Sequence, residues 1–477
     1  MLVSCDCPNE PVDILFVTKE TWPDIRASLP NIGQAFAAAC GFEPNPGRSQ
    51  ILPGPEGGIG RVLFGLESET AAWHDLFLPG QLEADLPAHL YRFANAPHDP
   101  SLAALAWLLS AYRFSRAKTR AAERPRLCVP QGVDPARIER ISEAVSFGRD
   151  LINTPANEMD PDGLEIAALE LAARFHAKAE VFRGEELLEK NLPLIFTVGR
   201  AAEKPPRLVD FRFGPESAPK VTLVGKGVCF DSGGLDIKSE SAMGLMKKDM
   251  GGAATALSLG LLLMQAALPI RLRVLLPIVE NAISAKAMRP GDIYPSRKGL
   301  RVEIGNTDAE GRLILADALA LADEEAPELL IDFATLTGAA RVALGPDLPP
   351  FYTMDEELAA EITRFGQATA DPVWRLPLWE PYDRLLDSKV ADLNNVSGGS
   401  HAGSITAALF LRRFVALAKS FVHFDIFAWA PKAKPGRPEG AEIQAARLLY
   451  ELIEARYGAA YGMAAAKTIP REATMTV

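Results

Sequence analysis

The chain has 477 residues, of which 48% are hydrophobic and 23% are charged, so it can form two domains and bury an apolar core in each. The formal net charge of −11 opposes broad attraction to nucleic acid or to anionic membranes, because binding to phosphate depends on clustered Lys and Arg. We therefore expect a soluble protein whose partners are neither nucleic acid nor membrane.

The N-terminus and the cysteines indicate the compartment. The chain begins MLVSCDCPNEPVDILF, with acidic residues where a secretory signal needs basic ones. The most apolar stretch, residues 253–268, is short for a bilayer and contains polar residues, so it predicts a buried helix. Five scattered cysteines without framework spacing favour a reducing environment. These features predict a cytoplasmic protein without a transmembrane span.

The first part of the chain alternates strand and helix candidates. Strands are predicted at residues 12–17 and 61–65, and helices at residues 32–39 and 102–111. This alternation predicts a small α/β domain over residues 1–125. Asp134 and Pro135 then form a strong helix start, since Asp can cap free amides and Pro is pre-set for the first turn. Residues 126–155 are therefore predicted to be a linker and a connecting helix.

The rest of the chain, residues 156–477, predicts a larger domain. Strands are expected at residues 193–198, 208–213, 221–224, 272–279 and 329–333, and helices at residues 253–268, 310–322 and 441–455. Continuous apolar strands separated by helices indicate a sheet that is covered on both faces. We expect a three-layer α/β/α domain with a central mixed sheet and a ligand site beyond the strand ends.

Acidic residues and a lysine fall at three strand or helix junctions. Lys226 follows an apolar strand, and Asp231 precedes Ser-Gly-Gly. Asp249 precedes two glycines at the start of a long apolar helix, while Asp308 and Glu310 open another helix. Taken singly, Asp231 is typical of a turn and Asp249 of a helix cap. Three such junctions at neighbouring strand ends can converge, and the glycines permit close approach of the backbone.

Charge favours a pair of metal ions at this place. Four carboxylates match two divalent cations, whereas four bare carboxylates in one cleft would repel and raise their own pKa values. Burial favours the neutral amine of Lys226, which can then bind a metal. Such ligands suit zinc, manganese or magnesium, and two ions can activate a bridging water for hydrolysis.

Lys238 and Arg312 lie close to these acids in the sequence and have two interpretations. Lys238 could donate to a developing oxyanion, and Arg312 could hold a small anion with its planar fork. Both could equally compensate the charge of the acidic cluster. The chain contains no HExxH motif, which excludes a zincin site.

Several segments carry a family resemblance. They are GRDLINTPANEM, VGKGVCFDSGGLDIK, LMKKDMGGAA, NAISAKAMRPGD, NTDAEGRLILADALALA, DFATLTGA and HAGSITAALFL. Over residues 142–449 the chain resembles the leucyl aminopeptidase family, the two-metal cytosol aminopeptidases. The resemblance implies a catalytic peptidase domain over residues 156–477 and two divalent metal ions per subunit, Mn, Zn or Mg.

The resemblance also implies residue roles. One metal would be held by Lys226, Asp231, Asp249 and Glu310, and the second by Asp231, Asp308 and Glu310. Lys238 and Arg312 would be the catalytic pair, with a bicarbonate at Arg312. Met246, Thr335 and Gly338 would line the pocket for the first side chain, and Leu336 would offer its carbonyl to the substrate.

The implied function is hydrolysis of the N-terminal residue from peptides or dipeptides that have a free α-amine, by a metal-bridging water. The implied assembly is a homo-hexamer. The chain departs from the family where typical members have HLDIAG, since it has HFDIFAW at residues 423–429. Bulky Phe427 and Trp429 therefore predict a reshaped first pocket in place of a simple preference for leucine.

Two other functions compete with this one. The same ions could support a two-metal phosphoester hydrolase. A scarcity of Arg and Lys around the ligands argues against it, because such side chains would be needed to hold the phosphate. A scaffold or DNA-binding member of the family is the non-enzymatic alternative. The intact ligand set and the acidic balance of the chain argue against it.

Overall fold

The computed structural model describes residues 2–3, 10–115 and 123–458, which divide into two compact units. The first unit comprises residues 1–150 together with 430–442, and the second comprises residues 151–429 and 443–477. The first unit thus takes in residues 430–442, which the sequence analysis placed in the larger domain. Among the described helices, none combines the length and apolar character needed to cross a membrane.

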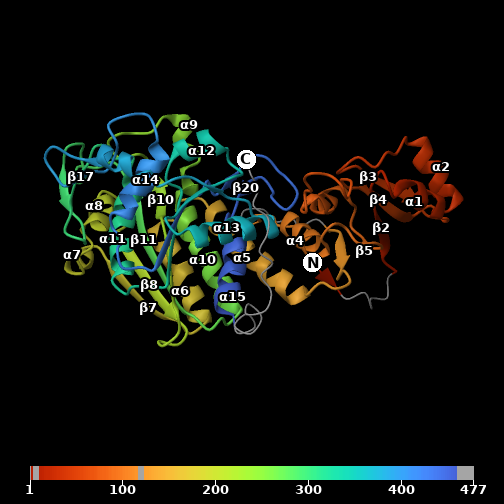
Figure 1. The fold of residues 1–477 in the computed structure, drawn as a ribbon, viewed down its shortest axis with the longest axis horizontal. Coiled ribbons are helices and arrows are strands. Elements are labelled where there is room, and N and C mark those ends of the chain that lie inside the picture. Colours follow the sequence, from red (N-terminus) through yellow and green to blue (C-terminus); the bar gives the residue numbers. More distant parts are fainter. Residues whose placement is uncertain (1, 4–9, 116–122, 459–477) are drawn as a thin grey trace. The chain divides into compact units, whose positions relative to one another are not determined.

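The first unit is built on a sheet with strand order β1-β6-β5-β2-β4-β3. Figure 1 labels the strands β5, β2, β4 and β3 of this sheet. Its strands are β1 (Leu2–Val3), β2 (Val12–Val17), β3 (Ser49–Pro53), β4 (Ile59–Gly65), β5 (Leu90–Phe93) and β6 (Arg126–Cys128). Its helices include α1 (Trp22–Ser28), α2 (Asn31–Ala39), η1 (Leu78–Gln81), α3 (Leu82–Asp85) and α4 (Pro100–Ser110). Strands and helices alternate, and the predicted α/β class of this part is confirmed.

Helix α5 (Pro135–Asn153) begins at the predicted start. The Asp134 carboxylate accepts hydrogen bonds from the backbone N–H groups of Ala136 (3.0 Å) and Arg137 (3.3 Å). These contacts satisfy two of the four amides that a helix N-terminus leaves free. A polar side chain just before proline therefore determines where this helix begins.

The second unit contains a mixed sheet with strand order β16-β15-β18-β14-β9-β11-β8-β7, and β10 pairs with β11. The strands are β7 (Lys178–Arg183), β8 (Arg207–Phe213), β9 (Lys220–Gly225), β10 (Gly227–Asp231), β11 (Arg271–Asn281), β14 (Leu329–Ala334), β15 (Pro350–Tyr352), β16 (Trp374–Arg375) and β18 (Ser420–Asp425). The central strands β11, β9, β14 and β18 are mutually parallel, so their carboxyl ends meet at one edge of the sheet.

Helices pack against both the sheet and one another. They are α6 (Pro161–Arg174), α7 (Glu186–Glu189), α8 (Pro193–Gly199), α9 (Glu240–Met243), η2 (Met246–Met250), α10 (Gly251–Gln265), α11 (Glu310–Asp323), α12 (Gly338–Leu344), α13 (Glu356–Ala368), η3 (Glu380–Leu386), α14 (Gly403–Arg412) and α15 (Ala446–Tyr457). Short strands β12 (Ile293–Pro295), β13 (Arg301–Glu303), β17 (Leu393–Asn394), β19 (Trp429–Ala430) and β20 (Gly440–Ala441) complete the elements. Helices α10 and α11 both contact β9 and β14, and their residues are almost entirely buried.

The predicted strand at residues 193–198 is wrong, because this segment forms helix α8. A short apolar run does not distinguish a buried helix from a buried strand. Pro193 occupies the first turn, and the distant Asp317 carboxylate accepts hydrogen bonds from Leu194 N (2.7 Å) and Ile195 N (3.4 Å). A side chain from helix α11 thus supplies the cap of α8.

The last helix begins at Ala446 and not at residue 441, as predicted. Asp371 accepts hydrogen bonds from the backbone N–H groups of Ala445 (3.2 Å) and Arg447 (3.1 Å), and Ala445 has a φ of 68°. The carboxylate that caps α15 therefore comes from far away in the sequence, where local patterns cannot show it.

Helix α10 starts unusually close to the ends of β9 and β14. The Lys226 amide donates to Phe333 O (3.0 Å), and Ala253 N donates to Lys226 O (2.8 Å). A Cβ on Gly252 would lie 2.1 Å from Phe333 O and 2.8 Å from Lys226 N. Only glycine allows this approach, which brings the start of α10 beside the strand end that carries Lys226.

Gly252→Ala is expected to lower the melting temperature, because the added methyl must push α10 away from β14. The overpacking lowers the free energy of unfolding by about 1–3 kcal/mol. Gly260→Ala in the same helix is the matched control, since its Cβ would meet only Val274 Cγ2 at 3.5 Å. In thermal unfolding, the melting temperature of Gly260→Ala should be unchanged or raised, since alanine is the better helix former. Equal melting temperatures for the two variants would contradict this account of the α10 contact.

Candidate metal centre

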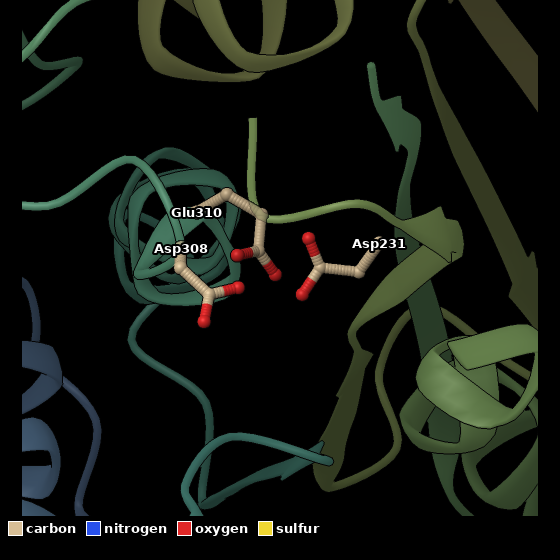
Figure 2. Close-up of side chains that lie close together, drawn as sticks. All are labelled: Asp231, Asp308 and Glu310. Atoms are coloured by element: carbon tan, nitrogen blue, oxygen red, sulfur yellow. The ribbon is translucent and has the colours of Figure 1, made fainter. Parts of the chain in front are cut away.

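Asp231, Asp308 and Glu310 converge at the carboxyl edge of the sheet. Asp231 ends β10, while Asp308 and Glu310 lie at the start of α11. Figure 2 shows their three carboxylates facing a common space, and one oxygen from each lies within 4.8 Å of the others. The predicted convergence of separate junctions is thus present in the structure.

The Asp231 side chain is held in a fixed direction. Its Oδ1 accepts hydrogen bonds from Gly233 N and from Asn281 Nδ2, both at 2.9 Å. Gly233 has a φ of +86°, which favours glycine in this turn. Asn281 also donates to Thr307 O (3.1 Å), so it ties the end of β10 to the segment before α11. No local sequence pattern predicts this role for Asn281.

Lys226 is 3% exposed and lies between two carboxylates. Its Nζ is 2.7 Å from Asp249 Oδ2 and 2.9 Å from Glu310 Oε1, and it donates to Thr335 O (3.1 Å). Burial alone would lower the pKa of Lys226, but Asp249 and Glu310 outweigh it and raise that pKa. The prediction that burial makes this amine neutral is therefore wrong for the protein chain by itself. A metal ion would have to compete with the proton for the amine.

The acids differ in how their neighbours affect them. Burial, and then the charge of Asp231, raise the pKa of Glu310 to about 8 and that of Asp308 to about 6. Burial acts in the same direction on Asp249, but Lys226 and Lys248 outweigh it and lower the pKa of Asp249. The predicted rise in pKa for clustered carboxylates therefore occurs at Glu310 and Asp308. It does not occur at Asp249, where the two lysines have the larger effect.

The donor set fits divalent cations. Both carboxylate oxygens of Glu310 are buried and accept no hydrogen bond from any residue that the structure describes. Apart from the ion pair between Oε1 and Lys226, these oxygens lack a partner among the described residues, and a dication would satisfy them while also reversing the rise in pKa. Carboxylates together with one amine are suitable ligands for manganese, zinc or magnesium.

Lys238 and Arg312 both lie at this site. Lys238 Nζ is 2.8 Å from Asp231 Oδ2 and also forms an ion pair with Asp308. Arg312 is buried and donates from Nη1 to Asn395 O (2.7 Å). Burial lowers the pKa of Arg312 to about 10, against the attraction of Glu310, so this side chain stays charged at neutral pH.

A cavity of about 290 Å³ opens onto these groups. Its lining includes the predicted site residues Lys226, Asp231, Lys238, Met246, Asp249, Asp308, Arg312, Thr335, Leu336 and Gly338. Glu310 lies buried against Lys226 and is not part of the lining. Phe427 is not part of it either, and its ring contacts the charged groups of Lys248 and Arg341 instead.

Sequence reasoning missed two cations of the cavity wall. Lys248 and Arg341 line it together with Lys226, Lys238 and Arg312, so the predicted scarcity of Arg and Lys around the ligands is wrong. Lys248 stands in the quoted segment LMKKDMGGAA, where only Met246 and Asp249 received roles. Burial lowers the pKa of Lys248 to about 8, partly offset by Asp249 and enhanced by Arg341.

Asp425 was also missed, although it positions the segment after β14. Its Oδ1 accepts hydrogen bonds from Leu336 N (3.0 Å) and Thr337 N (3.1 Å), and its Oδ2 accepts one from Thr337 Oγ1 (2.6 Å). This carboxylate at the end of β18 fixes the direction of the Leu336 peptide. The adjacent strand end thereby shapes one wall of the cavity.

Comparison with known proteins identifies the family. The description "M17 aminopeptidase, N-terminal domain" matches residues 14–130, and "Cytosol aminopeptidase family, catalytic domain" matches residues 146–450. The chain belongs to the cytosol aminopeptidase family. This membership confirms the resemblance seen in the sequence motifs, the two-domain α/β fold and the class of enzyme, a metallopeptidase.

Individual relatives agree with this membership. A probable cytosol aminopeptidase of Chlorobium limicola is 40% identical, in an alignment that spans 67% of this chain and 66% of the relative. A probable cytosol aminopeptidase of Chlorobaculum parvum is 36% identical, in an alignment that spans 90% of each chain. The crystal structure of a cytosol aminopeptidase from Coxiella burnetii matches with a TM-score of 0.90 and 43% identity, covering 96% of this chain and 99% of that one. The bottromycin maturation enzyme BotP in complex with Mn matches with a TM-score of 0.83 and 31% identity, covering 93% of this chain and 99% of that one.

Glu310→Ala is expected to reduce metal content and to lower kcat/KM at least a hundredfold, since residues that merely support a metal ligand are already worth about 10–100-fold. The variant should remain folded, because Glu310 is buried among other acids and Asp249 still pairs with Lys226 after its removal. Glu324→Ala, just beyond the other end of α11, is the matched control, since Glu324 pairs with Arg297 at the surface. Metal analysis and thermal unfolding check both variants. Full activity of Glu310→Ala would contradict the metal centre.

Proposed function

We propose that this protein is a two-metal aminopeptidase that removes the N-terminal residue from peptides or dipeptides with a free α-amine. The observation that carries the proposal is the buried, acceptor-rich space between Asp231, Asp308 and Glu310, beside Lys226. Membership of the cytosol aminopeptidase family supports peptides as the substrate class.

The ligand assignment follows the geometry and the family motifs. Lys226, Asp231, Asp249 and Glu310 would hold one ion, and Asp231, Asp308 and Glu310 the other. Manganese is supported by the relative that was solved with Mn, and zinc or magnesium would suit the same donors. When bound, the two ions supply polarisation of the scissile carbonyl and activation of a water between them.

The remaining residues act on the substrate. The Lys238 ammonium, held by Asp231 and Asp308, donates to the oxygen on which negative charge develops. The Arg312 guanidinium is directed by the Asn395 carbonyl and offers its other N–H groups to a small anion such as bicarbonate, which would receive the proton of the attacking water. The Leu336 carbonyl accepts a hydrogen bond from the substrate backbone.

Met246, Thr335 and Gly338 surround the first side chain in this proposal, and all three line the cavity. Thr335 also donates its hydroxyl to Asp249 Oδ1 (2.7 Å), which couples the pocket wall to a proposed metal ligand. Phe427 contributes indirectly, through the two cations that contact its ring.

The proposal extends to assembly and location. We propose a homo-hexamer in the cytoplasm, supported by the family resemblance and by relatives that are named cytosol aminopeptidases. Sedimentation of the purified protein should give the mass of six chains, and a monomer or dimer would contradict this assembly.

A panel of dipeptides, each with a free or an acetylated N-terminus, tests the proposed function. We expect hydrolysis of the free set and at least a hundredfold loss for the blocked set, because a site built to bind an amine rejects analogues that lack it. A chelator should abolish hydrolysis, and added Mn²⁺ should restore it. Comparable rates on blocked and free peptides would contradict the proposal.

A further inference from the structure

The cavity has a cationic side that the hydrolytic chemistry does not use. Lys248 lies in η2 between Met246 and Asp249, and Arg341 lies one turn after Gly338 in α12. Both residues line the cavity. Because Met246 and Gly338 border the proposed pocket for the first residue, the two cations flank the place where that side chain would lie.

Lys248 is a buried charge without a close partner. The residue is 1% exposed, and among the described residues its ammonium donates no hydrogen bond. Its ion pair with Asp249 Oδ1 is long, at 3.8 Å, and that oxygen already accepts a hydrogen bond from Thr335 Oγ1 at 2.7 Å. The other Asp249 oxygen is 2.7 Å from Lys226. A buried ammonium in this position favours an anion that arrives with the substrate.

Arg341 is fixed beside the same pocket. Its Cζ lies 4.6 Å from the centre of the Phe427 ring, and Lys248 Nζ lies 5.3 Å from that centre. Arg341 Nη1 donates to Thr337 O (3.3 Å), and Nη2 is 3.7 Å from where a Cβ on Gly338 would stand. The Phe427 ring, which lies behind the lining, therefore makes a cation–π contact with each of the two cations.

We propose that the first pocket selects peptides with an acidic N-terminal residue, glutamate or aspartate, and that Lys248 and Arg341 bind its side-chain carboxylate. This specificity rests on the proposed aminopeptidase function. Charge-assisted hydrogen bonds to ammonium and guanidinium groups are about twice as strong as neutral ones. A leucine side chain in the same position would leave the buried Lys248 without a close anionic partner, so the pocket would discriminate against it.

Two other roles for these cations make different predictions. They could only compensate the negative metal ligands, in which case their loss would affect all substrates alike. They could instead bind the C-terminal carboxylate of a dipeptide. Aminoacyl p-nitroanilides have no C-terminal carboxylate. If kcat/KM for these substrates depends on whether the amino acid is Glu, Gln or Leu, the cations must act on the amino-acid side chain.

The experiment compares kcat/KM for the Glu, Gln and Leu p-nitroanilides with the Mn²⁺-loaded protein. Glu and Gln have nearly the same shape, so their ratio isolates the charge. We expect Glu to exceed Gln and Leu at least tenfold. Lys248→Met should lower the Glu/Gln ratio about tenfold while hydrolysis of Leu is kept or improved. Lys247→Met is the matched control, since Lys247 contacts the Trp429 ring and donates to Asn153 O (2.7 Å) away from the cavity.

Several outcomes would overturn the specificity. They are equal or faster hydrolysis of Gln or Leu by the unaltered protein, and an equal loss on all three substrates in Lys248→Met. If Lys248→Met does not fold, Arg341→Gln, at a partly exposed side chain, should still lower the Glu/Gln ratio, and an unchanged ratio would contradict the proposal. No hydrolysis of any free aminoacyl anilide or dipeptide would contradict the aminopeptidase function itself.

Discussion

Repulsion among clustered carboxylates is the constraint on which the site depends. Asp231, Asp249, Asp308 and Glu310 share a small volume, where burial and mutual charge raise the pKa of Glu310 to about 8. Two lysines compensate part of this charge, since Lys226 pairs with Asp249 and Glu310, and Lys238 pairs with Asp231 and Asp308. The remaining need for positive charge is what makes the cluster suitable for dications.

The fold places these carboxylates close together by bringing several strand and helix ends to one edge of the sheet. Glycines at the start of α10 allow its backbone to approach β9 and β14, so that Asp249 forms an ion pair with Lys226. The start of α11 supplies two further acids, and Asn281 at the end of β11 orients Asp231. Because the four carboxylates come from three junctions that are separated in the sequence, the site forms only when the second unit is folded.

The sequence predicted most central elements and the convergence of Asp231, Asp308 and Glu310, because strand ends, glycines and acids have local signatures. It failed at residues 193–198, where a cap from Asp317 makes an apolar run helical. For Lys226 it indicated burial but not the two carboxylates beside it, which raise the pKa of this amine in the protein chain by itself. Lys248 and Arg341 were missed since their meeting at the Phe427 ring depends on side-chain directions from separate elements, which no local pattern contains.

The central claim is that five side chains hold two metal ions, and metal stoichiometry tests it most directly. Protein loaded with Mn²⁺ and freed of excess metal would be measured by plasma mass spectrometry, and its crystals by anomalous diffraction. The account predicts two ions per chain, both adjoining Asp231 and Glu310 and one of them adjoining Lys226. A single ion, or ions bound away from these residues, would contradict it.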